Sequence, residues 1–337
     1  MQLFNEHKKD DLSKVIALLI ICTTISFAMI SIFEWRYDFS GNIGTIRIWQ
    51  FLLAFFSGGA LGVSGLLLQK LTRNNLADIS ILGIGSLNLI FIIIFIICKY
   101  DGTTDSSAVL RVYLPLISIA SSILGTSIIY TLSKNKSDSC EKFTIIGIAL
   151  QFVFEAISVT LTNTKLINDA SDKAKINAEI QNFTYGRFPD VSKLSQNILW
   201  RGMTIAFVIA IIFITCIIYF FRREIDLLEL NEELAKFYGV NVKVLKGFLY
   251  FCISLLVGIE SAMIGSVALL GIVSASFTRL IFGNRSEIGI IVSFLVGGML
   301  VTLASFISVN LNKNVPIGFL STSLISPVFI YLLFKRN

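Results

Sequence analysis

Long apolar runs dominate the chain and predict membrane-spanning helices. A helix of about 20 apolar residues crosses a hydrocarbon core about 30 Å thick. By this measure the sequence predicts about ten spans, at residues 15–33, 48–69, 80–98, 112–132, 143–162, 197–221, 246–263, 265–281, 287–309 and 316–334. The span at 265–281 is short, which is tolerated where a broken helix lines a cavity. We therefore expect an all-α polytopic membrane protein, with residues 1–14 as an N-terminal tail and 15–337 as a single transmembrane domain.

Lysine and arginine residues are unevenly divided between the predicted loops. If the N-terminus lies inside, the inside segments hold most of them, including Lys8, Lys9 and Lys14 in the tail and Arg222 and Arg223 in a long inside connection. The short outside connections hold few. Cytoplasmic loops of membrane proteins carry an excess of Lys and Arg. The charge distribution thus predicts that both termini lie in the cytoplasm, and an even number of spans agrees with that.

Composition excludes several classes of protein. Hydrophobic residues make up 55% of the 337-residue chain and charged residues only 15%, whereas soluble domains carry about 25% charged residues. A soluble enzyme, a disordered protein and a nucleic-acid binder are all disfavoured. The single histidine, His7, lies in the tail, so a His-rich metal site within the membrane is not expected. No GxxxxGK[ST] sequence occurs, so the chain lacks the loop that would hold ATP phosphates, and we expect neither catalytic residues nor metal ligands.

The inside connection at 222–245 predicts an amphipathic helix. Its apolar residues recur at helical spacing and give one face, formed by Leu227, Leu230, Leu234 and Phe237. Charged residues fill the remainder, among them Glu229, Glu232, Glu233 and Lys236. Gly239 is expected to end the helix. Such a helix either lies on the bilayer or docks a soluble partner; the acidic residues favour docking, because the inner leaflet is anionic and attracts Lys and Arg.

Polar residues within the predicted spans have two interpretations. Gln151 and Glu155 lie one turn apart and share a helix face, and Glu260 lies near the outer end of its span. They either hydrogen-bond neighbouring helices or line a polar pathway, since a carboxyl group facing lipid is costly. We favour the pathway for Gln151 and Glu155 and leave Glu260 open between the two. Asn88 is expected to bind a neighbouring helix.

The most specific sequence feature follows the second predicted span. A run of small residues, Gly58, Gly59, Gly62, Ser64 and Gly65, allows close helix packing. It leads into the string 68–83, which resembles the "SG..LQ...RNPLADP..LG" signature of the FecCD-type permeases of binding-protein-dependent ABC importers for iron–siderophores, haem and cobalamin. The residues that carry this match include Gly65, Gln69, Arg73, Asn74, Asp78 and Gly83. Asn75 and Ile79 replace the two prolines of the pattern.

The resemblance continues in order along the chain. It includes residues 147–150 ("GIAL"), 230–240 ("LGEELA..LGV"), Arg279 in "G.I.FVGLIVPHIAR", and the segments 316–318 and 326–329. The chain departs from the family pattern at Ala275 and Ser276, which replace Pro-His, and on the outer face, where fewer arginines remain. If this chain is one half of a heterodimer, a second permease could supply the charges that are missing from the outer face.

The resemblance implies a type II ABC importer permease fold with short cytoplasmic coupling helices at about 224–242. It implies that two separate ATPase subunits dock there, on Leu230, Glu232, Glu233, Leu234, Ala235, Phe237 and Gly239. Gln151, Glu155 and Glu260 become candidates for the translocation path. Arg47 and Arg187 become candidate contacts for the binding protein, although Arg187, at the end of a predicted interfacial helix at 176–188, would also suit a solvated loop.

The resemblance also implies partners and cargo. We expect a bacterial cell-membrane protein that pairs with a second permease chain, in a heterodimer or a homodimer, and receives its cargo from an extracellular lipoprotein. The expected cargo is a ferric siderophore, with haem or cobalamin as alternatives. No cofactor is expected, because iron travels inside its chelator. An ion-coupled secondary transporter is the alternative of another class; it would need a coupling carboxylate and no ATPase.

Overall fold

The structure is a computed structural model that describes residues 43–80, 83–99, 104–134, 140–163, 184, 186, 198–311 and 315–335. Its helices are α2 (Ile43–Thr72), α3 (Ile84–Lys99), α4 (Thr104–Lys134), α5 (Cys140–Asn163), α8 (Ile198–Phe220), α9 (Arg222–Leu230), α10 (Glu232–Phe237), α11 (Val242–Ile264), α12 (Leu270–Phe282), α13 (Ser286–Leu311) and α14 (Ile317–Lys335). All regular structure in these residues is helical, as the apolar runs predict. The predicted tail and first span, 1–33, lie outside the described residues, as does nearly all of 176–188.

Several described helices can cross a membrane. Five stretches are long and apolar enough: Ile48–Thr72, Tyr113–Leu132, Trp200–Phe220, Val242–Ile264 and Ser286–Ser308. Three shorter apolar stretches are Ile84–Cys98, Ile145–Leu161 and Leu270–Phe282. The multi-pass architecture is therefore confirmed, while the number ten stays a prediction. The expected short span is α12, whose 13 residues reach about 20 Å at a rise of about 1.5 Å per residue.

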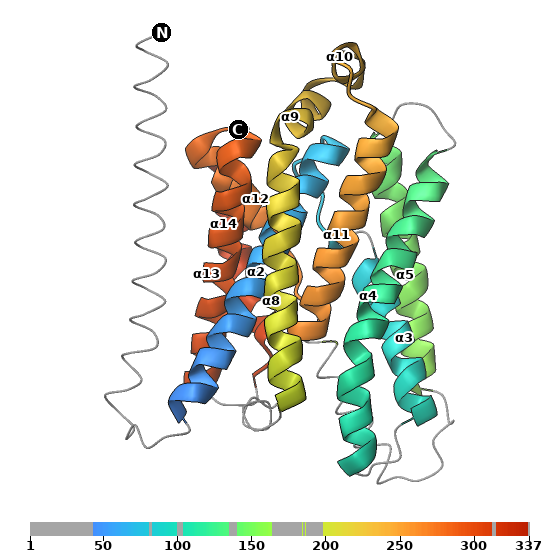
Figure 1. The fold of residues 1–337 in the computed structure, drawn as a ribbon, viewed down its shortest axis with the longest axis vertical. Helices are drawn as coiled ribbons and strands as arrows, with labels where there is room; N and C mark the ends of the chain where they lie inside the picture. Colours follow the sequence, from blue (N-terminus) through green and yellow to red (C-terminus); the bar gives the residue numbers. More distant parts are fainter. Residues whose placement is uncertain are drawn as a thin grey trace.

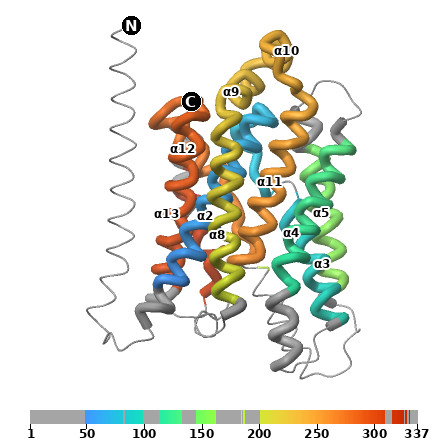
Figure 2. The backbone as a smooth tube through the Cα atoms, viewed as in Figure 1, coloured from blue at the N-terminus to red at the C-terminus, as the bar shows by residue number. Residues whose placement is uncertain are grey.

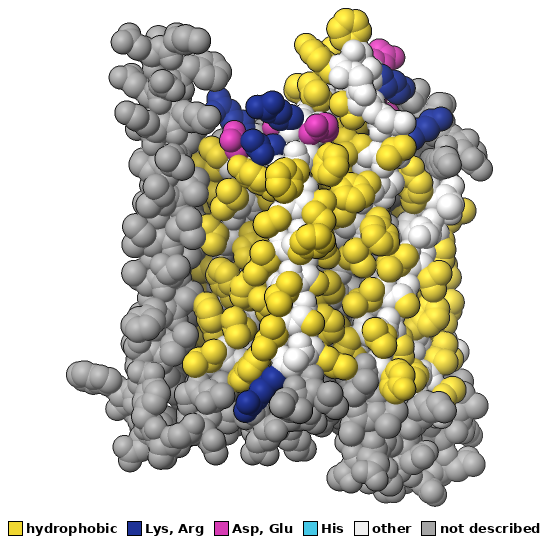
Figure 3. Space-filling view, in the orientation of Figure 1, with side chains coloured by type: hydrophobic (Ala, Val, Ile, Leu, Met, Phe, Trp, Pro, Cys, Tyr) yellow, Lys and Arg dark blue, Asp and Glu magenta, His cyan; other side chains and the backbone are white. Residues whose placement is uncertain are grey.

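The long helices run side by side in one bundle, and the short helices α9 and α10 lie at one end of it (Figures 1 and 2). Apolar side chains cover the visible face along the length of the bundle, whereas Lys, Arg, Asp and Glu side chains gather chiefly at the end that carries α9 and α10 (Figure 3). An apolar surface along the length of the bundle is what a hydrocarbon core demands of a spanning protein. The charge distribution along the sequence predicts that the α9–α10 end faces the cytoplasm.

Helix α2 is the buried centre of the bundle and is packed against α13, α11 and α12. Small residues allow this close approach. A Cβ atom built on Gly58 would lie 2.3 Å from the carbonyl oxygen of Gly297 in α13, and one built on Gly65 would lie 2.3 Å from the Cα of Gly271 in α12. Backbone-to-backbone packing of this kind supplies van der Waals energy in lipid, where the hydrophobic effect between helices is absent.

Helices α3, α4 and α5 form a second group, joined to the centre where α4 packs on α11. Buried Asn88 of α3 donates from Nδ2 to Ser122 Oγ at 3.0 Å and accepts from Ser121 Oγ at 2.5 Å. Both serines belong to α4. The expectation that Asn88 holds two helices together is therefore confirmed.

Candidate functional site

The segment predicted as one amphipathic helix is two helices, and that prediction is wrong. Asn231 takes an extended conformation (φ −163°, ψ 136°) between α9 and α10. Its side-chain oxygen accepts the backbone N–H of Glu233 at 2.9 Å and so caps the N-terminus of α10. Asparagine favours this cap over a helix interior because its side chain competes for backbone donors.

The break divides the predicted apolar face. Leu227 of α9 is half-buried and packs against the hydrophobic core, as do the fully buried Leu228 and Ala235. Leu230, Leu234 and Phe237 are instead 73%, 46% and 85% exposed. Three large apolar side chains at the polar end of the bundle, close in sequence and without described packing partners over most of their surface, form a candidate docking surface.

Gly239 ends α10, as its sequence position predicts. Its φ of +83° lies in the left-handed region, which glycine adopts without strain. The N–H of Val240 donates to the carbonyl of Ala235 at 2.9 Å, and that of Gly239 donates to Lys236 at 2.9 Å. This pair of bonds is a Schellman motif, which satisfies the last carbonyls of the helix. The docking surface is thus carried on a helix that is closed at both ends.

Glu232 connects this surface to its neighbours. Its carboxylate lies 2.5 Å from Lys246 Nζ in α11 and 4.0 Å from Arg73 Nη2. Burial alone would raise the pKa of Glu232, but the hydrogen bond and charge of Lys246, with the charges of Arg73 and Lys236, hold it below its ordinary value. Glu233, by contrast, is exposed and takes part in the helix cap through its backbone only among the contacts described.

The signature residues after α2 form an irregular segment between α2 and α3. Arg73 has a positive φ of 49° and donates from Nη2 to the carbonyl of Leu228 at 3.0 Å, which ties this segment to α9. Asn74 Oδ1 accepts the N–H of Leu76 at 3.0 Å. Asn75 Oδ1 accepts a hydrogen bond from Arg279 of α12. The polar signature residues therefore satisfy a non-helical backbone and join it to α9 and α12.

Asp78 reaches across the bundle to the start of α12. It is 2% exposed, and its Oδ2 accepts the N–H of Leu269 at 3.1 Å, as well as a hydrogen bond from Ser80 Oγ. Leu269 is the N-cap residue of α12 and has a left-handed backbone with φ 63°. A carboxylate at a helix N-terminus is favoured by the helix dipole. Asp78 thus caps a helix whose N-cap residue lies 191 residues later in the chain.

The candidate path residues are not brought together as one group. Gly83, with a φ of +69°, lies against the backbone of Gln151, since a Cβ on Gly83 would be 2.9 Å from the Gln151 Cα. Gln151 is half-buried at this contact, whereas Glu155 is exposed on the bundle surface. Glu260 is buried in α11 with 2% exposure, and its Oε1 has no hydrogen-bond partner among the described residues. Gln69 is likewise buried, and neither of its amide atoms has a partner there.

The structure does not describe the side chains of the two residues that are expected to contact the binding protein. Arg187 lies outside the described residues. Arg47 belongs to α2, but its side chain is not described. Their expected contact with a binding protein stays a prediction.

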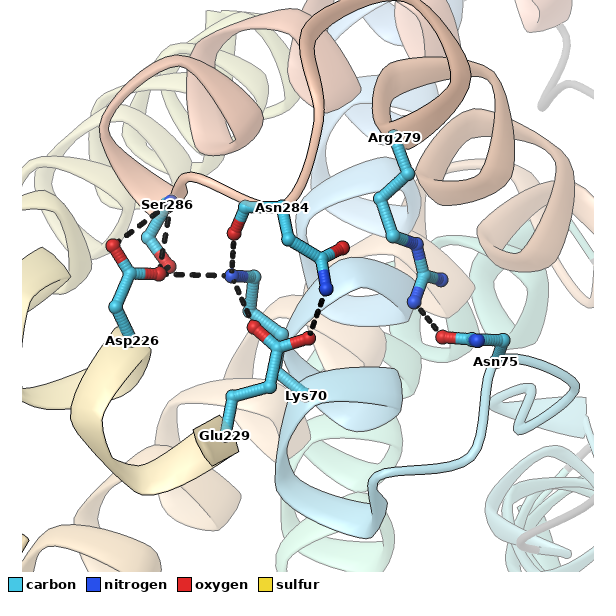
Figure 4. A network of polar contacts seen from close by, with 7 residues as sticks. All are labelled: Lys70, Asn75, Asp226, Glu229, Arg279, Asn284 and Ser286. Atoms are coloured by element: carbon cyan, nitrogen blue, oxygen red, sulfur yellow. Dashed lines mark hydrogen bonds and ion pairs between the residues drawn. The ribbon is translucent and has the colours of Figure 1, made fainter. Parts of the chain in front are cut away.

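An ion cluster around the buried Lys70, at the α9–α10 end, was not anticipated from the sequence (Figure 4). Lys70 Nζ of α2 donates to Asp226 Oδ1 at 2.9 Å, to Glu229 Oε2 at 2.7 Å and to the carbonyl oxygen of Asn284 at 2.6 Å. Its side chain is 2% exposed. The available signal was a lysine inside an otherwise apolar helix end, which demands a partner when buried.

The comparisons with known proteins cover nearly the whole chain. The model of the FecCD transport family matches residues 13–335. The chain is 26% identical over 293 residues to the iron(3+)-hydroxamate import system permease protein FhuG of Bacillus subtilis, covering 86% of this chain and 83% of that protein. It is 26% identical over 296 residues to the hemin transport system permease protein HmuU of Yersinia pestis, with coverage of 87% and 83%. It is 22% identical over 332 residues to the vitamin B12 import system permease protein BtuC of Yersinia enterocolitica, with coverage of 96% and 92%.

The fold has a solved counterpart. A structure described as a metal-chelate type ABC transporter in an inward-facing conformation superposes with a TM-score of 0.80 at 19% identity, covering 96% of this chain and 99% of that one. Because the family model matches residues 13–335, which include the whole described bundle, this chain belongs to the FecCD transport family.

Proposed function

We propose that this chain is the permease subunit of an ABC importer that carries a ferric siderophore into the cytoplasm, driven by separate ATPase subunits. The observation that carries the proposal is the exposed apolar surface of Leu230, Leu234 and Phe237 on a helix capped at both ends. A membrane permease of this family has no phosphate-binding loop of its own, so its energy must come from a partner.

The docking surface suits a helix-in-groove contact with such a partner. Apolar anchors on a short helix supply most of the energy when they enter a cleft. Phe237 and Tyr238 stand edge to face, with ring centroids 5.8 Å apart, at the tip of α10. Two ATPase subunits, one for each permease chain, would receive two such tips.

A second permease chain is proposed to cover α5. Much of the described surface of this helix is exposed, including Phe152 at 67% and Val153 at 52%, and Glu155 is exposed among them. A carboxyl group facing lipid is unfavourable, so Glu155 is better placed against a partner or a polar passage. We therefore place Gln151 and Glu155 at the wall of the passage between two permease chains, whether identical or different.

The substrate proposal is supported by the names of the relatives. FhuG is named for iron(3+)-hydroxamate import, and another relative from Bacillus subtilis, YfiZ, is named a probable siderophore transport permease and is 24% identical over 336 residues. HmuU and BtuC are named for hemin and vitamin B12. Iron would travel inside its chelator as cargo, so the permease needs no cofactor. An extracellular lipoprotein would deliver it, with Arg47 and Arg187 as proposed contacts, and both termini would lie in the cytoplasm.

Uptake in reconstituted vesicles tests the proposal. The chain is purified with its ATPase, its binding protein and any second permease encoded beside it, and the vesicles are offered radiolabelled ferric ferrichrome, haemin or cyanocobalamin. We expect uptake of the ferric hydroxamate that requires ATP. A preference for haemin or cyanocobalamin would change the proposed substrate but leave the proposed importer function intact. Uptake driven by an ion gradient without ATP would overturn both.

A further inference from the structure

The ion cluster around Lys70 joins three elements that are far apart in the sequence. An ammonium group has three donors, and those of Lys70 are all used, by Asp226 and Glu229 of α9 and by the Asn284 carbonyl in the turn between α12 and α13. The cation itself extends from α2. One buried charge therefore binds the docking end to the central helix and to the turn before α13 (Figure 4).

Each carboxylate of the cluster also binds the start of α13 or the turn before it. Asp226 accepts the backbone N–H of Ser286 at 3.0 Å and its hydroxyl at 2.6 Å, and Ser286 is the first residue of α13. A carboxylate at that N-terminus is favoured by the helix dipole. Glu229 accepts from Asn284 Nδ2 at 3.0 Å. Helix α9 is thus held to α13 even without Lys70, and Lys70 fixes that pair to α2.

The contacts of α10 are of a different kind. Its described side-chain ion pairs run to Lys246 in α11 and to Arg73, and all three side chains are partly exposed. Lys70 and Glu229, in contrast, are 2% and 17% exposed, less than any side chain of the α10 pairs, while Asp226 is 38% exposed. Screening by water weakens exposed pairs far more than buried ones. The firm connection between the docking end and the bundle centre therefore runs through α9.

We propose that Lys70 is a positioning residue for transport, which makes α2, α9 and the start of α13 one moving body. A displacement that a docked ATPase imposes on α9 and α10 is then passed to α2 and α13, whose backbones touch at Gly58 and Gly297. This inference rests on the proposed function only for the source of the displacement. A buried cation with three hydrogen-bond partners can join these helices firmly. Without it, the two carboxylates of Asp226 and Glu229 must separate or become hydrated.

A distance measurement tests the connection without any substrate. Spin labels are placed on exposed Arg223 of α9 and exposed Ile48 of α2, in a background without the native cysteines, and pulsed electron resonance gives the distance distribution. In the otherwise unaltered permease we expect a narrow distribution that is the same with the ATPase nucleotide-free or bound to ATP. Lys70→Met should broaden it, and Lys70→Arg should narrow it again. A distribution in Lys70→Met as narrow as in the parent would overturn the proposal.

A coupling measurement tests the consequence. In the reconstituted complex, Lys70→Met should still bind the ATPase and hydrolyse ATP, while transport of ferric ferrichrome per ATP falls about tenfold, within the usual range of coupling between sites. The matched control is Glu287→Gln, which removes a 3.9 Å ion pair between α9 and α13 whose side chains are 27% and 48% exposed. It should change the ratio less than about twofold, as exposed pairs contribute little.

A third variant separates positioning from folding. If Lys70→Met does not insert, the triple variant Lys70→Met, Asp226→Asn, Glu229→Gln leaves no buried unpaired charge and should show the same loss of coupling. An unchanged ratio of transport to ATP hydrolysis in either variant, even with lowered thermal stability, would overturn the proposal. If the parent chain binds no ATPase, the proposed function fails instead, and the distance measurement on the permease alone still decides whether Lys70 fastens α9.

Discussion

Replacing Gly65 by alanine should weaken the contact between α2 and α12. The added Cβ would lie 2.3 Å from the Cα and 2.6 Å from the carbonyl carbon of Gly271. Both are backbone atoms, so no side chain can rotate away to make room. Ordinary contact with a Cβ begins at 3.4 Å, so the two backbones must separate by roughly 1 Å in a densely packed interior.

The magnitude follows from comparison with Gly202 in α8, where a Cβ would meet nothing within 4 Å. Both substitutions gain the same preference of alanine over glycine in a helix, about 1 kcal/mol. Only Gly65→Ala adds overpacking, which destabilises by about 1–3 kcal/mol. The difference between the two variants should therefore be about 1–3 kcal/mol, because the common gain cancels.

Thermal unfolding of the detergent-solubilised permease measures this difference. We expect the apparent midpoint of Gly202→Ala to equal or exceed that of the parent, and that of Gly65→Ala to lie a few degrees lower. Equal midpoints for the two variants would refute the close approach of α2 and α12. A loss in Gly65→Ala that Gly271→Ala reproduces would support it, since the Cβ on Gly271 would lie 2.9 Å from the Gly65 Cα.

Three further predictions concern the docking end and the passage. Leu234→Asp, at a position 46% exposed, should leave the permease folded but abolish pull-down of the ATPase, because it would bury a charge in the partner's cleft; undiminished pull-down would show that α10 is not the docking element. Glu155→Gln should lower uptake without loss of assembly, and failure of the two permease chains to co-purify would instead assign Glu155 to their packing. The Glu232–Lys246 contact should persist above the ordinary Glu pKa of 4.5 and be lost as the pH falls through the lowered pKa of Glu232 in the folded state. A spin label on Tyr238 should become more mobile when the contact is lost. In Lys246→Met the same label should be mobile at every pH.

Apolar run length was enough to place most of the described helices, because burial in lipid is decided by composition over a whole turn or more. The α9–α10 break was missed for the opposite reason. Apolar spacing continued through Asn231, and periodicity does not register a single residue whose side chain captures a backbone N–H. The family pattern "LGEELA" has glycine where this chain has Asn231, and glycine in the pattern already indicated a non-helical residue at this position.

The ion cluster could not be derived from spacing at all. Lys70 and Asp226 are 156 residues apart, and Lys70 and Asn284 are 214 apart. Nothing local in the sequence relates them. The sequence does show a lysine at the end of an otherwise apolar helix. If that lysine is buried, its ammonium group requires anionic partners elsewhere in the chain. Their identity depends on which helix ends meet, which is a property of the tertiary fold.

The irregular segment between α2 and α3 gives the signature residues a common physical purpose. Helix α3 begins at Ile84, which is fully buried, and Ala77, Asp78 and Ile79 before it are buried as well, so part of this irregular segment lies in the protein interior (Figure 1). Non-helical backbone at membrane depth is tolerated only where the protein satisfies it. Asn74 Oδ1 accepts the N–H of Leu76, and the Asn74 carbonyl accepts that of Ala77 at 3.1 Å. The carboxylate of Asp78 accepts the N–H of Ser80 at 3.4 Å.

Asp78 allows this reasoning to be tested, because acceptor and charge can be separated there. Asp78→Leu would leave the N–H of Leu269 without its acceptor at the start of α12, at about 1–3 kcal/mol for an unpaired buried donor. Asp78→Asn keeps one oxygen that can take the place of Oδ2, so it should destabilise less. Hydrogen exchange over the first turn of α12 should therefore accelerate strongly in the leucine variant and weakly in the asparagine variant. If asparagine proves as harmful as leucine, the site requires the negative charge rather than the acceptor, and the helix dipole of α12 is the partner that needs it.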